Sequence, residues 1–206
     1  MTQAVFTSPI DAAEGGGLLA FEIGIAATAV PIDENAAYWV RSVKSDLTTG
    51  GYLLVPRVMA GKGIGLGTLW ASYAEIPDSD VQIVGGAFDF PLIRGGLARP
   101  TLALRATYTQ ILGIDEFDLR AAGGEVYISK GFGPLTPYAS AGIVHSRSEG
   151  HVTSQIPTFV PIILEDRFEQ ERFTVGLRIS LLIPKIVIEA TQAEERTYAA
   201  KVSLGL

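Results

Sequence analysis

The sequence predicts an all-β fold: a closed antiparallel up-and-down transmembrane β-barrel of about ten strands, with eight or twelve as the alternatives. Three observations predict it. Runs of about ten residues with an apolar side chain at every second position recur along the 206-residue chain, as in strands whose side chains alternate between two faces. Charged residues make up only 18% of the chain, although about 25% is typical of soluble proteins. No apolar run approaches the roughly 18 residues of a spanning helix.

The last ten residues show the alternation most clearly. Tyr198, Val202 and Leu204 fall on one face of a strand, while Lys201 and Ser203 fall on the other. The same alternation predicts ten strands at residues 18–30, 52–60, 64–73, 81–92, 101–110, 117–129, 136–145, 172–182, 186–192 and 197–206. The barrel is therefore expected over residues 18–206, preceded by a flexible lead-in at residues 1–17. That lead-in has no basic region followed by an apolar run, so we expect a secretory signal to be absent or already removed.

Two predicted strands change phase at a pair of glycines. The apolar alternation shifts by one position at Gly85-Gly86 in one strand and at Gly123-Gly124 in another. Because glycine inside a strand commonly marks a bulge, and a bulge reverses which side chains face outward, we expect a bulge at each pair.

The connections between strands differ in length and charge. The two longest, at residues 31–51 and 146–171, are both odd-numbered and therefore share one end of an up-and-down barrel. The even-numbered connections carry Lys and Arg and no acid, whereas the odd-numbered ones carry all of the loop acids. Outer-membrane barrels have short periplasmic turns and longer extracellular loops. The pattern therefore predicts an orientation with both termini in the periplasm. The net charge of −6 argues against a nucleic-acid partner.

A soluble barrel is the main alternative, because its strands also alternate. In a soluble barrel the polar face would be rich in Lys, Glu, Gln and Asn, but here it carries mostly Gly, Ala, Ser and Thr. Aromatic residues also gather near the predicted strand ends, as in the interfacial girdles of membrane barrels. The aromatics of this predicted girdle are Tyr38, Trp39, Tyr52, Trp70, Tyr73, Phe117, Tyr127, Phe132 and Tyr138.

Residues 129–139, SKGFGPLTPYA, together with the alternation that continues to the C-terminus, resemble small outer-membrane β-barrel proteins of Gram-negative bacteria. The resemblance covers residues 18–206. It implies a location in the bacterial outer membrane, with outer-membrane lipid as a partner. That family usually ends in an aromatic residue, which the barrel-assembly machinery recognises, whereas this chain ends in Leu206.

The alternation places charged side chains on the inner face of the barrel. Buried charges are costly unless they are paired, so we expect an interstrand salt-bridge network that fills the lumen. A charged constriction that selects ions is the alternative. The predicted lumen charge network consists of Glu22, Arg57, Asp89, Arg105, Asp118, Arg120, Glu125, Arg178, Glu189 and Lys201.

The connection at residues 146–171 has an apolar centre, which is unexpected for a loop exposed to water. We predict a loop interaction site for a protein partner, or a lid over the barrel mouth, and an extended hairpin is the alternative. The residues of the predicted loop site are Phe159, Val160, Ile162 and Ile163.

Catalytic, metal and cofactor sites are not expected. His145 and His151 lie near Ser146 and Ser148, but the spacing does not match the His-x-Ser of outer-membrane lipid deacylases. The chain has no cysteine, and the acids of residues 165–171 are interpreted as solvated surface charge instead of a calcium site. Two functions remain. The first is a non-catalytic barrel with a structural or interaction role, and the second is a narrow channel or transporter for ions or a small apolar solute. A lipid-modifying hydrolase is less favoured.

Overall fold

The computed structural model describes residues 6–13, 16–31, 48–49, 51–76, 81–96, 98–113, 117–152, 162–181 and 183–205. These residues form eleven antiparallel strands of one sheet. The strands are β1 (Phe21–Pro31), β2 (Thr48–Thr49), β3 (Tyr52–Gly63), β4 (Thr68–Glu75), β5 (Gln82–Ile93), β6 (Thr101–Leu112), β7 (Phe117–Ser129), β8 (Leu135–Val152), β9 (Ile162–Ser180), β10 (Pro184–Gln192) and β11 (Arg196–Gly205). None of the described segments is a helix long and apolar enough to cross a membrane.

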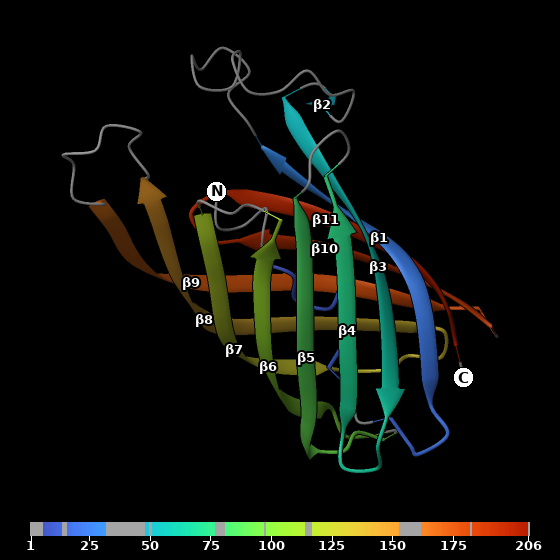
Figure 1. Ribbon diagram of the computed structural model, residues 1–206. Helices are drawn as coiled ribbons and strands as arrows, with labels where there is room; N and C mark the ends of the chain where they lie inside the picture. The colour runs from blue at the N-terminus through green and yellow to red at the C-terminus, as the bar shows by residue number, and fades with distance from the viewer. Residues whose placement is uncertain are drawn as a thin grey trace.

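The sheet closes on itself. From β3 to β11 each strand pairs with the next strand in the chain, and β1 pairs with both β11 and β3, which completes a ten-stranded ring (Figure 1). The short strand β2 pairs only with the start of β3. The predicted up-and-down barrel and its strand number are confirmed. We call the end with the connections at 64–67, 94–100, 130–134 and 181–183 the turn end, and the opposite end the loop end. β1 begins and β11 ends at the turn end.

The β8–β9 hairpin is longer than predicted. Its ladder runs without interruption from Leu135 opposite Ile179 to Val152 opposite Ile162. It therefore extends well past β10, whose ladder with β9 ends at Phe173, and slightly past β7, which pairs with β8 as far as Gly150. The prediction of a loop at residues 146–171 is therefore wrong for 146–152 and 162–171. The apolar alternation stops near His145, but backbone hydrogen bonds do not require apolar side chains, and the ladder continues.

The predicted bulges at the two diglycines are absent. The register of β5 with β6 is continuous through Gly85-Gly86, as is that of β6 with β7 through Gly123-Gly124. The one shift in these ladders lies between Pro91 and Ile93. The apolar alternation changes phase in the sequence because the inner face is apolar near the loop end, whereas nearer the turn end the outer face is apolar. We call the inner apolar side chains near the loop end the apolar layer, which consists of Val55, Ala74, Ile83, Ile111 and Leu119.

The outer face of the barrel is apolar and exposed. Large side chains project from every strand of the ring, and we call them the outer belt: Ile23, Ile25, Leu54, Val58, Leu69, Phe90, Leu104, Val126, Ile128, Ile143, Phe173, Val175, Ile188 and Val202. The inner face carries the buried polar and charged residues instead. This polarity is that of a transmembrane barrel and the reverse of that of a soluble barrel, so the soluble alternative is wrong.

Tyrosines mark the border of the outer belt at the loop end. Tyr52, Tyr73, Tyr108 and Tyr198 all project from the outer face with 37–48% of their surface exposed. Of the aromatics predicted for the girdle, Tyr52 and Tyr73 belong to this border, and Phe132 is exposed at the turn end. The prediction is wrong for three residues that face the lumen: Trp70, Tyr127 and Tyr138. Tyr38 and Trp39 lie outside the described residues, and the side chain of Phe117 is not among those described.

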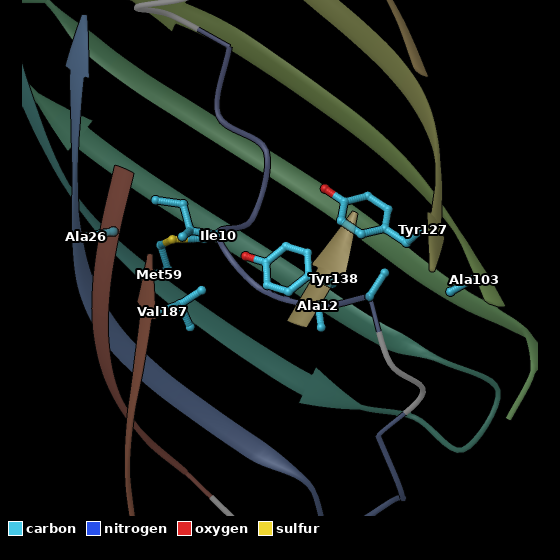
Figure 2. Close-up of a cluster of buried hydrophobic side chains, with 9 residues drawn as sticks. Ile10, Ala12, Ala26, Met59, Ala103, Tyr127, Tyr138 and Val187 are labelled. Carbon is cyan, nitrogen blue, oxygen red and sulfur yellow. The ribbon is translucent and has the colours of Figure 1, made fainter. Parts of the chain in front are cut away.

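Residues 6–13, which we call the N-terminal segment, lie inside the barrel. Every one of them is buried, with Ile10 and Ala13 each only 1% exposed. Figure 2 shows Ile10 and Ala12 of this segment among side chains of the wall. The sequence led us to expect a lead-in that precedes the barrel, but this part of it fills the lumen. The segment combines apolar with hydrogen-bonding side chains, which suits an interior of the same mixed character.

Candidate functional site

The candidate site is the lumen, where charged side chains of the wall surround the N-terminal segment. Near the turn end, Asp11 accepts hydrogen bonds from Lys201 Nζ at 2.7 Å and from Arg178 Nη1 at 3.1 Å. Lys201 also contacts Glu22 at 2.5 Å, and Glu22 contacts Lys185 at 2.8 Å. Asp11 thus joins strands β9 and β11, and Glu22 on β1 joins β10 and β11.

Arg105 forms the second part of the network. Its guanidinium binds both carboxylate oxygens of Asp89, at 2.6 and 2.8 Å, in the bidentate geometry that suits arginine. It also donates to the carbonyl oxygens of Pro9 and Asp11, at 2.5 and 3.1 Å. Those carbonyls belong to irregular backbone away from water, where an unpaired polar group is costly. Arg105 therefore pairs the wall with the main chain of the N-terminal segment. Trp70 Nε1 adds a hydrogen bond to Asp89 at 3.0 Å.

Glu125 is another charged residue of the wall that contacts the N-terminal segment. It accepts hydrogen bonds from Ser8 at 3.0 Å and from Ser140 at 3.3 Å, and it lies 3.3 Å from Arg172. Elsewhere on the wall, Tyr138 donates to Glu189. The Arg57 guanidinium donates to Thr28 at 2.8 Å. Most of these charged groups are thus held by partners from a neighbouring strand or from the N-terminal segment.

Apolar contacts complete the packing around the N-terminal segment. Ile10 and Ala12 pack in one cluster with Met59, Val187 and Tyr138, as Figure 2 shows. Burial of a side chain as large as Ile10 contributes about 1.5–3 kcal/mol relative to exposure.

Two glycines of the wall make room for the N-terminal segment. A Cβ atom at Gly85 would lie 2.0 Å from Thr7 Oγ1, and one at Gly123 would lie 2.8 Å from the ring of Phe6. The neighbouring glycines face outward: at Gly86 the nearest atom would be 3.7 Å away, and at Gly124 there is open space. The first glycine of each pair that suggested a bulge therefore permits close approach of the segment.

The structure places eight residues of the predicted lumen charge network on the inner face: Glu22, Arg57, Asp89, Arg105, Glu125, Arg178, Glu189 and Lys201. The prediction is wrong for Asp118 and Arg120, which lie on the outer face of β7 and pair with each other at 2.6 Å. They were assigned to the lumen because a bulge was expected at Gly123-Gly124. Without that bulge, Glu125 faces inward and the even-numbered residues of β7 face outward.

Three charged residues of the network were missed. Asp11 lies in the expected lead-in, Lys185 in an expected turn, and Arg172 at the first residue of an expected strand. Strand alternation could have identified Lys185 and Arg172. Lys185 is odd-numbered like the other inward-facing residues of β10, and Arg172 is even-numbered like those of β9. Asp11 has no such signal, because the N-terminal segment has no strand periodicity.

The predicted loop site falls largely beyond what the structure describes. Phe159 and Val160 lie outside the described residues. The backbone of Ile162 and Ile163 belongs to β9 and pairs with Val152 and His151, as in an extended hairpin, while their side chains are not described. A partner at this site stays a proposal.

The described residues include no group of three or more His, Asp or Glu side chains that could hold a metal ion. At the turn end, a small cavity of about 130 Å³ lies beside the N-terminal segment, lined by residues that include Asp11, Glu22, Trp70 and Lys185. Space of this size holds a few water molecules. The arrangement therefore fills and stiffens the lumen.

No protein-family model matches the sequence, and no curated protein matches it. The N-terminal β-barrel domain of Pseudomonas aeruginosa OprF is similar over 92% of this chain and 98% of its own, at 12% identity and a TM-score of 0.39. Neisserial surface protein A is similar over 90% of this chain and 94% of its own, at 10% identity and a TM-score of 0.36. Outer membrane protein Omp33 of Acinetobacter baumannii is similar over 92% of this chain and 100% of its own, at 6% identity and a TM-score of 0.38.

Gly85→Val is expected to displace the N-terminal segment, because its side chain would occupy the position of Thr7. The chain has no cysteine, so Ala12→Cys provides a single reporter at a site that is 3% exposed. We expect a maleimide to label this cysteine about tenfold or more faster in the Gly85→Val background, as local opening becomes easier. Gly86→Val, on the outer face, is the matched control and should leave the rate unchanged. Equal rates in both backgrounds would show that the segment does not depend on Gly85.

Asp11→Asn is expected to destabilise the folded barrel by about 3–5 kcal/mol, because it leaves the buried Lys201 ammonium and Arg178 with less negative charge nearby. The measurement is the free energy of unfolding in urea. Asp118→Asn removes the same charge from an exposed pair on the outer face, and it should cost far less. A loss as small for Asp11→Asn as for Asp118→Asn would contradict the assigned role of Asp11.

Proposed function

We propose that this chain is an integral, non-catalytic β-barrel of the bacterial outer membrane, with a structural or interaction role and a lumen closed by its own N-terminal segment. The observation that carries the proposal is the combination of an exposed apolar outer belt with a filled, charge-paired interior. The interaction with a protein partner is assigned to the loop end.

The membrane location follows from the outer belt. A water-soluble protein rarely exposes so large a continuous apolar surface. In a bilayer every backbone polar group needs an internal partner, and a closed barrel provides one because it has no free edge. Polar residues such as Glu75, Gln110 and Arg196 appear on the outer face just beyond the tyrosine border. The belt thus ends where headgroups would begin.

The orientation follows from the two ends. The connections at the turn end are short and carry Arg94, Arg99 and Lys130, and Lys62 and Lys185 lie on strands at the same end. The two longest connections lie at the loop end. Short turns face the periplasm in outer-membrane barrels. We therefore assign the turn end, where β1 begins and β11 ends, to the periplasm.

The β8–β9 hairpin supports an interaction role at the loop end. It extends well past β10 and carries ion pairs on its exposed face: Arg147 with Glu149 at 2.8 Å and His145 with Glu169 at 2.8 Å. A paired, regular hairpin that projects from the membrane offers a protein partner a firm surface. The apolar residues Phe159 and Val160 belong to the connection between the two strands, and Ile162 and Ile163 begin β9. These four residues are the proposed contact.

A catalytic role has little support from the strand geometry around His145. His145 faces outward and pairs with Glu169, whereas Ser146 faces inward and is 4% exposed. Adjacent residues of a strand point to opposite faces, so these two side chains do not form a nucleophile and base.

Val126→Arg tests the membrane location. Val126 lies in the middle of the outer belt on β7, where an arginine is expected to cost about 2–4 kcal/mol in a bilayer. The measurement is reversible folding in urea into phospholipid vesicles. Gln110→Arg, beyond the tyrosine border on β6, is the control and should cost less than 1 kcal/mol. Equal effects would place the belt outside the hydrocarbon.

Planar-bilayer recording tests the closed lumen against the alternative of a narrow channel or transporter for ions or a small apolar solute. We expect the full chain to insert without steady single-channel currents, because the N-terminal segment is buried inside the lumen and is held there by ion pairs with the wall. Steady, charge-selective conductance of the full chain would establish the channel instead.

A further inference from the structure

A basic hollow of about 620 Å³ opens at the turn end, between the β5–β6 turn, the β7–β8 turn and β9. Three arginines line it, and no acidic residue is among its lining residues. Three hydroxyl side chains from the ends of strands β6, β7 and β8 complete its polar surface. The residues that matter here are Arg94, Arg99, Arg178, Thr101, Ser129 and Thr136.

Hydrogen bonds hold the two turns that form the hollow. Lys130 on the β7–β8 turn donates to the carbonyl oxygens of Gly96 and Arg99 on the β5–β6 turn, at 2.7 and 3.3 Å. Within the β5–β6 turn, the Gly96 N–H donates to the Arg99 carbonyl at 3.0 Å, and the Gly95 N–H donates to Thr101 Oγ1 at 3.2 Å. The hollow is therefore a built feature of the turns.

The side chains of the hollow match an oxyanion. Guanidinium groups bind phosphate through parallel N–H donors, and hydroxyl groups can add further donors. Arg178 is engaged by Asp11 and Thr136, and Arg94 Nη2 donates to the Gly65 carbonyl oxygen at 2.6 Å. A guanidinium has five N–H donors, so this one bond leaves Arg94 with donors for an anion, and Arg94 and Arg99 are the main candidates to bind it. The space is open beside Gly96, where an added Cβ atom would meet nothing within 4 Å.

The surroundings indicate where the phosphate comes from. The outer wall next to the hollow exposes Leu92, Ile93, Phe132 and Leu135, each by 42–60%. If the outer belt lies in a bilayer, as the proposed function states, this rim lies at the headgroup level of one leaflet. Lipid phosphates are then the oxyanions nearest to the hollow, and Lys and Arg at a membrane surface attract anionic lipids.

We propose that the hollow at Arg94 and Arg99 binds the phosphate group of an anionic glycerophospholipid. The inference rests on the proposed membrane location and assigns a lipid class to one end of the barrel. The lipid would keep its acyl chains against the apolar outer wall, while its phosphate sits on the two arginines.

The test uses the full chain in nanodiscs that contain phosphatidylcholine with a minor share of phosphatidylglycerol. After extraction into a neutral detergent, native mass spectrometry counts the phosphatidylglycerol retained by each barrel. We expect the double variant Arg94→Gln/Arg99→Gln to retain about fivefold less than the natural chain. Lys62→Gln is the matched control, because it removes a cation from the same end whose ammonium donates to the Leu18 carbonyl. It should retain the natural amount.

A second pair of variants keeps both arginines. Gly96→Asp places a carboxylate in the hollow and should reduce phosphatidylglycerol retention as strongly as the double arginine variant does. Gly17→Asp adds the same charge at another open position of the turn end and should leave retention unchanged. Equal retention in all variants would overturn the proposal. So would binding of inorganic phosphate, followed by its ³¹P shift, without preferential retention of the lipid. Failure of the natural chain to enter bilayers would instead refute the proposed function.

Discussion

The carboxylate of Asp11 offsets part of an excess of positive charge in the wall of the barrel. The inner face carries the bases Arg57, Arg105, Arg172, Arg178, Lys185 and Lys201 against the acids Glu22, Asp89, Glu125 and Glu189. An uncompensated charge away from water costs several kcal/mol. Asp11 lies within 3.1 Å of Lys201 and Arg178, near the turn end. The wall is therefore not electrostatically complete without the N-terminal segment, which is part of the folded barrel.

The wall is shaped to hold that segment. Irregular backbone inside a protein needs hydrogen-bond partners, and the wall supplies them through Arg105 to Pro9 and through Thr109 to the N–H of Thr7. The same wall has glycine at Gly85 and Gly123, where any larger residue would collide with Thr7 or Phe6. Ion pairs, hydrogen bonds and the shape of the wall therefore all favour the same position of the N-terminal segment. A substitution that displaces the segment from one of these contacts weakens the others as well.

The strands of the barrel could be predicted from the sequence, but the contacts inside the lumen could not. Alternation predicted all ten strands of the ring, because the outer belt repeats with period 2 on each of them. It failed where the inner face is also apolar, since Ile83 and Leu119 imitate a change of phase and led to the wrong assignment of Asp118 and Arg120. The role of Asp11 could not be predicted from the sequence, because it depends on strands more than 160 residues away along the chain, as its hydrogen bond to Arg178 shows.

The two ends of the lumen differ in the chemistry of their walls. The N-terminal segment reaches the interior from the turn end, where Gly16 donates to Thr68, and it is held there by ion pairs. Near the loop end the apolar layer lines the inner face of strands β3 to β7 instead. Withdrawal of the segment would expose the charged wall but leave this apolar surface in place. Because the segment fills the lumen, the chemistry available to other molecules lies at the ends of the barrel, on its hairpin and turns.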